Sequence, residues 1–334
     1  MNYVRSLAAL SRSDEARFGG KSSALGELLA AGIPVPPGFG LSTGAYEAFI
    51  AQSDLQPLID GALSAGGGAG QKVAEAMRSA PLPDRVRDEI ASGYRELGEP
   101  AVAVRSSAVG EDSAQATFAG QQETSLWVRG VDAVCSAVRD CWASLYSAPA
   151  TAYRAHLGDT AHPAMGVTVQ LMVDAEVSGV MFTCNPVTGD PSMIAINASW
   201  GLGLAVVGGE VTPDDYLVSK VTREVVREQI SAKAIQYVPR ADGGTERIEV
   251  APGRREVGCL TAEAISSLVE VGRRIESHFG SHQDVEWAIP GSDEIFVVQS
   301  RPVTAVNKRD KAKPPPSAIS LVMGTFGAGG SDGA

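Results

Sequence analysis

Four polar residues near the end of the chain have the types that phosphate chemistry needs: Asp284, Glu286, Gln299 and Arg301. Carboxylate and amide oxygens are hard ligands suited to Mg²⁺, which usually bridges to the phosphates of a substrate. An arginine suits a phosphoryl oxygen because its planar guanidinium donates two parallel hydrogen bonds. If the four side chains converge, they form a site for a metal and a phosphate. A solvent-facing pair of strands with an ordinary Asp–Arg contact would carry the same residues.

A predicted β-hairpin would bring these residues together. The segments 283–289 (QDVEWAI) and 294–300 (EIFVVQS) have strand patterns and flank a Pro-Gly-Ser-Asp turn. Successive side chains of a strand point to opposite faces, so the polar residues of both strands are expected on one face. If residue 289 pairs with residue 294, then 284 lies opposite 299 and 286 lies opposite 297.

Lys21 is a separate candidate for contact with a phosphate. It follows Gly19 and Gly20 and precedes a predicted helix at residues 22–31, whose first N–H groups would favour an anion beside the ammonium group. The stretch is not a P-loop, because that motif needs a glycine at position 15, which is Glu15. A glycine-rich helix entry with a solvated lysine would have the same sequence.

Arg105 ends a short apolar strand predicted at residues 101–105 and enters a polar loop predicted at 106–121. A basic side chain that leaves a buried strand in this way suits an anion, and a plain strand-end cap fits equally well. The run 201–209 (GLGLAVVGG) is predicted to be a glycine-rich turn. It is not a dinucleotide-binding fingerprint, because Val206 stands where the third glycine would be.

Helices and strands are interleaved along the rest of the chain. Further helices are predicted at residues 43–52, 73–97 with a break at 81–83, 131–147, and 261–279 with Thr261 at its start. Further strands are predicted at 166–174, 178–183 and 193–198, and a loop at 65–71. This order indicates a mixed α and β protein of two lobes, divided near residues 165–170.

The composition excludes several classes of protein. The 334 residues carry a net charge of −11 at pH 7, which argues against a broad surface for nucleic acid or anionic membrane. No apolar run approaches the roughly 18–20 residues of a membrane-spanning helix, and the N-terminus is too charged for a signal peptide. Four cysteines without metal-site spacing predict reduced thiols and a cytoplasmic protein.

Six stretches, in order, resemble the N-terminal nucleotide-binding domain of phosphoenolpyruvate synthase, pyruvate phosphate dikinase and rifampicin phosphotransferase. They cover almost all of residues 18–304 and are specific as an ordered set. They are FGGKSSALGELLAAGIPVPPGF (18–39), VAVRSSAVGEDSAQATFAGQQET (102–124), GVTVQLMV (166–173), SGVMFTCNPVTG (178–189), ASWGLG with GGEVTPDDY (198–216), and QDVEWAI with VVQSRPVT (283–304).

The resemblance implies an α+β ATP-grasp fold that holds ATP between two lobes, residues 1–168 and 169–305, followed by a linker or tail at 306–334. By position in these motifs, Lys21, Arg105 and Arg301 would be catalytic residues that contact phosphates. The other implied ATP contacts are Thr117 and Gly120 near the phosphates, Gln170, Met172 and Val173 at the adenine, and Asp284 close to the metal. Glu286 and Gln299 would bind Mg²⁺.

In this family ATP phosphorylates a histidine on a separate swivelling domain, and the synthase branch releases AMP and phosphate. None of the four histidines, His156, His162, His278 and His282, has the Thr-Ser-His context of that phosphocarrier. The resemblance therefore implies an ATP-dependent phosphotransferase that needs a partner chain carrying the histidine and acceptor domains. A fragment of a longer enzyme is the alternative.

Two departures from the family pattern leave other functions open. Leu204 stands where synthase-type members have glutamate, although Glu210 is close in sequence, and His282 stands where proline is common. A lost carboxylate would fit a nucleotide-binding regulatory subunit without catalysis. An ATP-grasp ligase that forms an acyl phosphate is a third hypothesis.

Overall fold

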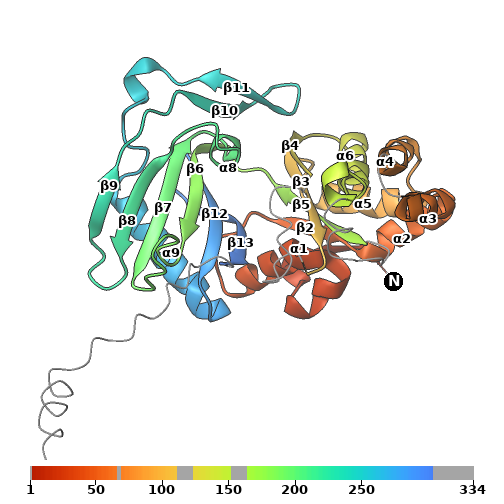
Figure 1. The fold of residues 1–334 in the computed structure, drawn as a ribbon, viewed down its shortest axis with the longest axis horizontal. Coiled ribbons are helices and arrows are strands. Elements are labelled where there is room, and N and C mark those ends of the chain that lie inside the picture. The colour runs from red at the N-terminus through yellow and green to blue at the C-terminus, as the bar shows by residue number, and fades with distance from the viewer. Residues whose placement is uncertain (1, 66–68, 111–122, 152–163, 304–334) are drawn as a thin grey trace, which may run out of the picture.

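The computed structural model describes residues 2–65, 69–110, 123–151 and 164–303. The predictions for Thr117 and Gly120 lie outside these ranges. Within them, the strands form a five-stranded sheet, a six-stranded sheet and a two-stranded ribbon, and every paired strand is antiparallel (Figure 1). The two larger sheets belong to two lobes, as the sequence predicts.

The first lobe is a five-stranded sheet covered on one face by helices. Its strands, in the order β1-β2-β5-β3-β4, are β1 (Val4–Ser6), β2 (Gly38–Leu41), β5 (Met165–Leu171), β3 (Val102–Ala108) and β4 (Thr124–Val128). The covering helices are α2 (Thr43–Gln52), α3 (Gln56–Ala65), α4 (Ala69–Ser79), α5 (Asp84–Glu96) and α6 (Val131–Ser144). Trp142 stacks on Phe49 at the centre of this core, with ring centroids 5.2 Å apart.

The second lobe is a six-stranded sheet packed against one long helix. Its strands, in spatial order, are β13 (Phe296–Pro302), β12 (Gln283–Pro290), β6 (Ala175–Phe182), β7 (Met193–Trp200), β8 (Asp214–Ser219) and β9 (Val225–Gln229). Ile265, Leu268 and Ile275 of α9 (Ala262–Phe279) enter its core. Thr261 caps α9 as predicted, because its hydroxyl accepts the Ala264 N–H at 3.1 Å.

A two-stranded arm, β10 (Ile235–Pro239) and β11 (Thr245–Glu249), connects the two lobes (Figure 1). Its base is held in the second lobe, where the Leu202 N–H donates to the Tyr237 carbonyl at 2.9 Å. At its tip the Gly244 N–H donates to the carbonyl of Trp127 on β4 at 3.0 Å. The remaining short elements are α8 (Leu204–Val207) and the 3-10 helices η1 (Leu7–Ala9), η2 (Arg12–Asp14) and η3 (Pro252–Arg254).

Helix α1 (Glu15–Ala30) lies between the lobes and packs against both. Glycines on the first sheet allow its close approach: a Cβ added at Gly166 would lie 2.4 Å from the Phe18 carbonyl oxygen. On its other side, Leu25 and Leu28 are buried in the core of the second lobe. The chain then runs along β13, where the Val297 N–H donates to the Pro34 carbonyl at 2.8 Å. The segment that carries Lys21 is therefore shared by the two lobes.

Helix α9 holds the C-terminal end of α1. Arg274 donates from Nη2 to the carbonyls of Ala31 and Gly32, at 3.2 and 2.9 Å, and so satisfies acceptors that a helix end leaves open. One turn further on, His278 Nε2 lies 3.1 Å from Glu27 Oε2.

Glu27→Gln is expected to lower the melting temperature at pH 7. The difference in melting temperature between this variant and the wild type should shrink in acid. The other Glu27 oxygen accepts the Arg12 amide at 2.7 Å, and this bond, assisted by His278, holds the pKa of Glu27 below its ordinary value. A depressed folded-state pKa gives stability that is present above the unfolded pKa and lost as pH falls through the folded one. Melting curves between pH 7 and 3 measure this.

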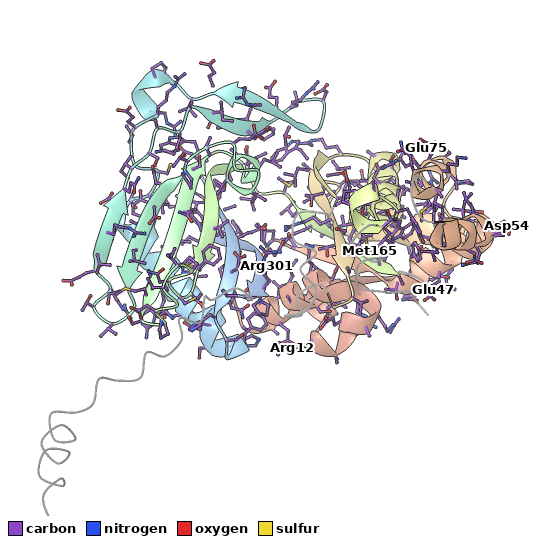
Figure 2. All side chains as sticks on the ribbon, in the orientation of Figure 1. Arg12, Glu47, Asp54, Glu75, Met165 and Arg301 are labelled. Carbon is purple, nitrogen blue, oxygen red and sulfur yellow. The ribbon has the colours of Figure 1, made fainter. Side chains whose placement is uncertain are left out.

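The control is Glu47→Gln, which changes an exposed glutamate on α2 (Figure 2). Its difference from wild type should stay small and constant with pH. A Glu27→Gln difference that does not narrow in acid would contradict the assigned role of the Arg12 amide.

The hairpin is confirmed, but its predicted register is wrong. Asp284 lies opposite Arg301, and Glu286 lies opposite Gln299, each two residues from the predicted partner. Next to the turn the register is already offset by one residue, and a β-bulge between Glu286 and Trp287 adds one more. Because the total offset is even, the four polar side chains still share one face.

Other boundaries differ more modestly. Strand β3 continues to Ala108, so the first residues of the loop predicted at 106–121 are strand, and α4 begins within the loop predicted at 65–71. The predicted division between residues 168 and 169 falls inside β5, whose residues all belong to the first lobe. We propose that the division lies between Leu171 and Ala175, where the chain passes to the second sheet.

No helix in the described ranges is long and apolar enough to cross a membrane. The four cysteines are buried, and none is in a disulfide. The cytoplasmic location stays a prediction.

Candidate functional site

Arg105 links the two lobes through three acceptors on the hairpin. Its Nη2 donates to Glu286 Oε2 at 3.0 Å and also to Gln299 Oε1, while its Nη1 donates to the Val298 carbonyl at 3.0 Å. The Arg105 side chain is only 11% exposed and that of Glu286 is 26% exposed. The two oxygens predicted to bind a metal therefore converge on a single guanidinium nitrogen.

The β-bulge supplies the third acceptor. Gln299 pairs with Glu286 and Val297 pairs with Trp287, so Val298 has no partner residue across the ladder. Its carbonyl is consequently available to Arg105. Sequence alternation contains no signal for this bulge, and the role of Val298 was not predicted.

Asp284 and Arg301 form a second charged pair beside the first. Arg301 donates from Nε and Nη2 to Asp284 Oδ2 at 2.9 and 2.8 Å. Burial raises the pKa of Asp284 above its ordinary value, although Arg301 opposes this shift. Figure 2 shows Arg301 on the side of the second sheet that faces the first lobe. The structure thus brings Arg105, Asp284, Glu286, Gln299 and Arg301 to one end of the hairpin.

Lys21 lies on α1, and its side chain is buried, with the residue only 6% exposed. Gly19, two residues earlier, interrupts the helix with φ +79° and ψ 168°. This is the Gly-Gly turn predicted before residue 22, although the helical residues on its other side were not predicted. Gly19 lies against Ser107, which follows Arg105 by two residues on β3 and shares its face. The predicted phosphate-contacting residues Lys21 and Arg105 thus come from adjoining segments.

The predicted adenine-contacting residues lie where the first sheet ends. Gln170 is buried on β5, and its Nε2 donates to the Pro36 carbonyl at 3.4 Å. Met172 and Val173 follow β5 and are partly buried against an apolar cluster that belongs to the second lobe and its arm. The buried members of this cluster are Ala175, Leu202 and Ala288, and Tyr237 and Val298 pack beside them.

Comparison with known proteins identifies the family. Residues 15–319 match the model of the pyruvate phosphate dikinase AMP/ATP-binding domain. The chain belongs to this family. The predicted α+β ATP-grasp fold and the predicted binding of ATP are thereby confirmed.

Curated relatives agree with the dikinase-domain assignment. The chain is 40% identical over 339 residues to a probable phosphoenolpyruvate synthase of Methanothermobacter thermautotrophicus, covering 97% of this chain and 49% of the relative. It is 37% identical to a phosphoenolpyruvate synthase of Pyrococcus furiosus, covering 93% of this chain and 45% of the relative. The chain thus spans about half the length of the curated relatives it matches.

Two solved structures are also similar to this dikinase-family chain. The ADP complex of N5-carboxyaminoimidazole ribonucleotide synthetase is 11% identical, with a TM-score of 0.29 over 65% of this chain and 38% of that one. Biotin carboxylase from Campylobacter jejuni is 13% identical, with a TM-score of 0.28 over 84% of this chain and 42% of that one. At these scores neither structure adds to the family assignment.

The structure shows what surrounds Leu204 and His282, the two residues that depart from the expected pattern. Leu204 begins α8, and the nearby Glu210 faces the arm, since it accepts the Tyr237 hydroxyl at 2.8 Å and lies 3.5 Å from Arg247 Nε. Glu210 therefore has partners other than a nucleotide in this structure. His282 Nδ1 lies 2.6 Å from Glu276 Oε1.

Proposed function

We propose that this chain is the ATP-binding, phosphoryl-donating component of a dikinase-type phosphotransferase. It would pass the β-phosphoryl group of ATP to a histidine on a separate partner chain, with release of AMP and with water accepting the γ-phosphoryl group as inorganic phosphate. The observation that carries the proposal is the convergence of Glu286 and Gln299 on Arg105, within a chain of the dikinase AMP/ATP-binding family.

The nucleotide would lie between the two sheets. Its phosphates would face Lys21, Arg105 and Arg301, which are cationic and come from α1, β3 and β13. Its base would lie against the backbone and side chains of Met172 and Val173, which link the two sheets and pack on the apolar cluster of the second lobe. Apolar walls with a few polar groups are the usual lining of such sites.

The donor set fits Mg²⁺. In the part of the chain that the structure describes, no three His, Cys, Asp or Glu side chains group closely enough to hold a metal alone. Magnesium needs no such cage, since one or two protein ligands suffice when phosphates and waters complete the shell. Glu286 Oε2 and Gln299 Oε1 already share one cationic partner, so they are close enough to share a metal ion. The bound ion would neutralise phosphate charge.

The residues would act mainly by position and charge. Phosphoryl transfer passes through a loose transition state with charge spread over oxygens, so fixed cations are the main catalytic resource. Lys21 and Arg301 would hold phosphoryl oxygens, and Arg105 would turn from the hairpin oxygens to the phosphates when the metal takes its place. Asp284 would keep Arg301 oriented through its two hydrogen bonds.

The direct test supplies the chain with ATP, Mg²⁺ and a candidate partner that carries a phosphorylatable histidine. The expected result is equal amounts of AMP and phosphohistidine, the latter labile in acid. Formation of ADP without AMP would instead favour a ligase-type reaction, and the absence of phosphohistidine on every candidate partner would contradict the proposal.

Lys21→Met is expected to weaken ATP binding about 10- to 150-fold, because a charge-assisted contact to phosphate contributes about 1.5–3 kcal/mol. Methionine keeps the length and apolar stem of the buried side chain, so the loss reports the charge. Titration calorimetry with ATP measures it. The matched control, Lys72→Met, removes an exposed lysine of α4 and should leave ATP affinity unchanged. Equal affinities for wild type and Lys21→Met would exclude a phosphate contact.

Leu204 and the partners of Glu210 favour a second candidate, a nucleotide-binding regulatory subunit. The chain has leucine at a position where the resemblance implies a carboxylate, and Glu210 is directed to the arm. This candidate predicts tight ATP binding with no turnover beside a competent partner. Restored turnover in Leu204→Glu would identify the missing carboxylate as the cause.

A further inference from the structure

Ser107 makes two hydrogen bonds that bridge the interruption in α1. The residue is fully buried on β3. Its hydroxyl donates to the Phe18 carbonyl at 2.9 Å and accepts the Ser22 N–H at 3.2 Å. These two groups lie on either side of Gly19 and Lys21, so a single hydroxyl holds both ends of the short segment that contains the lysine.

The bond to Ser22 acts as a helix cap. After the break at Gly19, the helix restarts, and its first N–H groups have no acceptor one turn earlier. A serine at the N-cap position normally supplies that acceptor from within the helix, and here a serine from a neighbouring strand supplies it. The Ser22 hydroxyl lies 2.7 Å from Thr168 Oγ1 on β5, which ties the same turn to the next strand.

We propose that Ser107 is a positioning residue for Lys21, so that strand β3 sets the location of two of the three phosphate-facing cations, Lys21 and Arg105. Arg105 would be placed directly, as a side chain of the strand, and Lys21 through the Ser107 hydroxyl two residues later. The inference rests on the proposed function, because it supposes that the bridge holds Lys21 in place to contact the phosphates of ATP. It names a residue that touches no phosphate and acts only on the backbone around Lys21.

Ser106 offers a matched control on the same strand. It is also fully buried, but it is adjacent to Ser107 and so points to the opposite face, and its hydroxyl has no hydrogen-bond partner. Ser106→Ala and Ser107→Ala therefore delete the same atom from neighbouring, equally buried positions. Removing an unsatisfied buried hydroxyl is expected to leave stability equal or improved.

The experiment is a double-mutant cycle on ATP affinity, with amide hydrogen exchange on the unliganded chain. Ser107→Ala is expected to weaken ATP binding roughly tenfold and to speed exchange at the Ser22 amide, since a lost cap is worth about a factor of ten. Added to Lys21→Met, the same change should weaken binding less than twofold, because residues that act as a unit are not additive. Ser106→Ala should alter neither quantity.

Ser107→Cys is a second variant that keeps the test possible if Ser107→Ala does not fold. A thiol is a weaker hydrogen-bonding group of similar shape, so an intermediate loss of ATP affinity is expected. Equal losses from Ser107→Ala in the wild-type and Lys21→Met backgrounds would overturn this inference and leave the proposed function standing. If the wild-type chain binds no ATP, the proposed function is wrong, and the role of Ser107 in ATP binding is wrong with it. Exchange at the Ser22 amide would then measure only the helix cap.

Discussion

Glu286→Gln is expected to abolish the strengthening of ATP binding by Mg²⁺ and to reduce phosphoryl transfer at least about 100-fold. Loss of one preorganised electrostatic group commonly costs two to three orders of magnitude in rate. Glutamine keeps the shape and one oxygen of the side chain but removes the negative charge that would hold the cation. The change therefore separates metal binding from packing.

The fold should tolerate this change. Glu286 is partly exposed, and Arg105 would keep its bonds to Gln299 and to the Val298 carbonyl. No buried charge is left without an acceptor, which is the usual cause of a large loss when one partner of an ion pair is removed. The melting temperature without ligands is accordingly expected to change little.

Calorimetric titration of ATP with and without Mg²⁺ measures the effect and needs no partner chain. The ratio of the two affinities should fall to about one in Glu286→Gln. The control is Glu294→Gln, which alters an exposed glutamate beside the turn of the same hairpin and should keep the wild-type ratio. A full magnesium effect in Glu286→Gln would remove Glu286 from the metal site.

The hairpin illustrates how far alternation of residue types can predict a site. Its period of two correctly placed Asp284, Glu286, Gln299 and Arg301 on one face, and this survived an error of two residues in the register. The bulge could not be predicted, because an extra residue in one strand leaves no signal in the alternation of residue types. The same bulge frees the Val298 carbonyl, so the missed feature is part of the site.

The placement of α1 depends on contacts with residues that are far away in the sequence, more than the placement of the hairpin does. The sequence showed a Gly-Gly-Lys turn before a helix, but the surface that receives this turn comes from residues more than 80 positions away. In the sequence Gly166 has no feature that separates it from the other residues of its strand. The structure shows why it is glycine: the Phe18 carbonyl lies where a Cβ would be. Local patterns therefore predicted the turn and the helix that follows it, and long-range packing decided where they are held.

We propose that Arg105 has two alternative positions in the site. In the structure the guanidinium neutralises Glu286 and joins the first lobe to the second through three bonds. With a metal at the same oxygens, like charges would repel, and the guanidinium would turn to the phosphates. The phosphate-facing state of Arg105 would thus depend on the metal, which couples the two ligands of the site.

Gly19→Ala is expected to destabilise the chain by about 2–6 kcal/mol and to weaken ATP binding as well. Gly19 has φ +79° and ψ 168°, a backbone region that is essentially restricted to glycine and where a side chain costs about 1–3 kcal/mol. An added Cβ would also lie 1.9 Å from the Ser107 carbonyl oxygen, far inside van der Waals contact, and such overpacking costs a further 1–3 kcal/mol or so. The backbone of β3 must then move away from α1, and the Ser107 bridge must lengthen.

Gly98→Ala separates these two costs. Gly98 has φ +86°, yet a Cβ there would meet no atom within 4 Å, so this change should cost only the conformational part, about 1–2 kcal/mol. Urea unfolding of both variants measures the difference, and ATP titration should show a loss for Gly19→Ala alone. If the two variants are equally stable, the close approach of β3 to α1 does not constrain the fold. Lys21 would then be held by the helix itself rather than by the strand that carries Arg105.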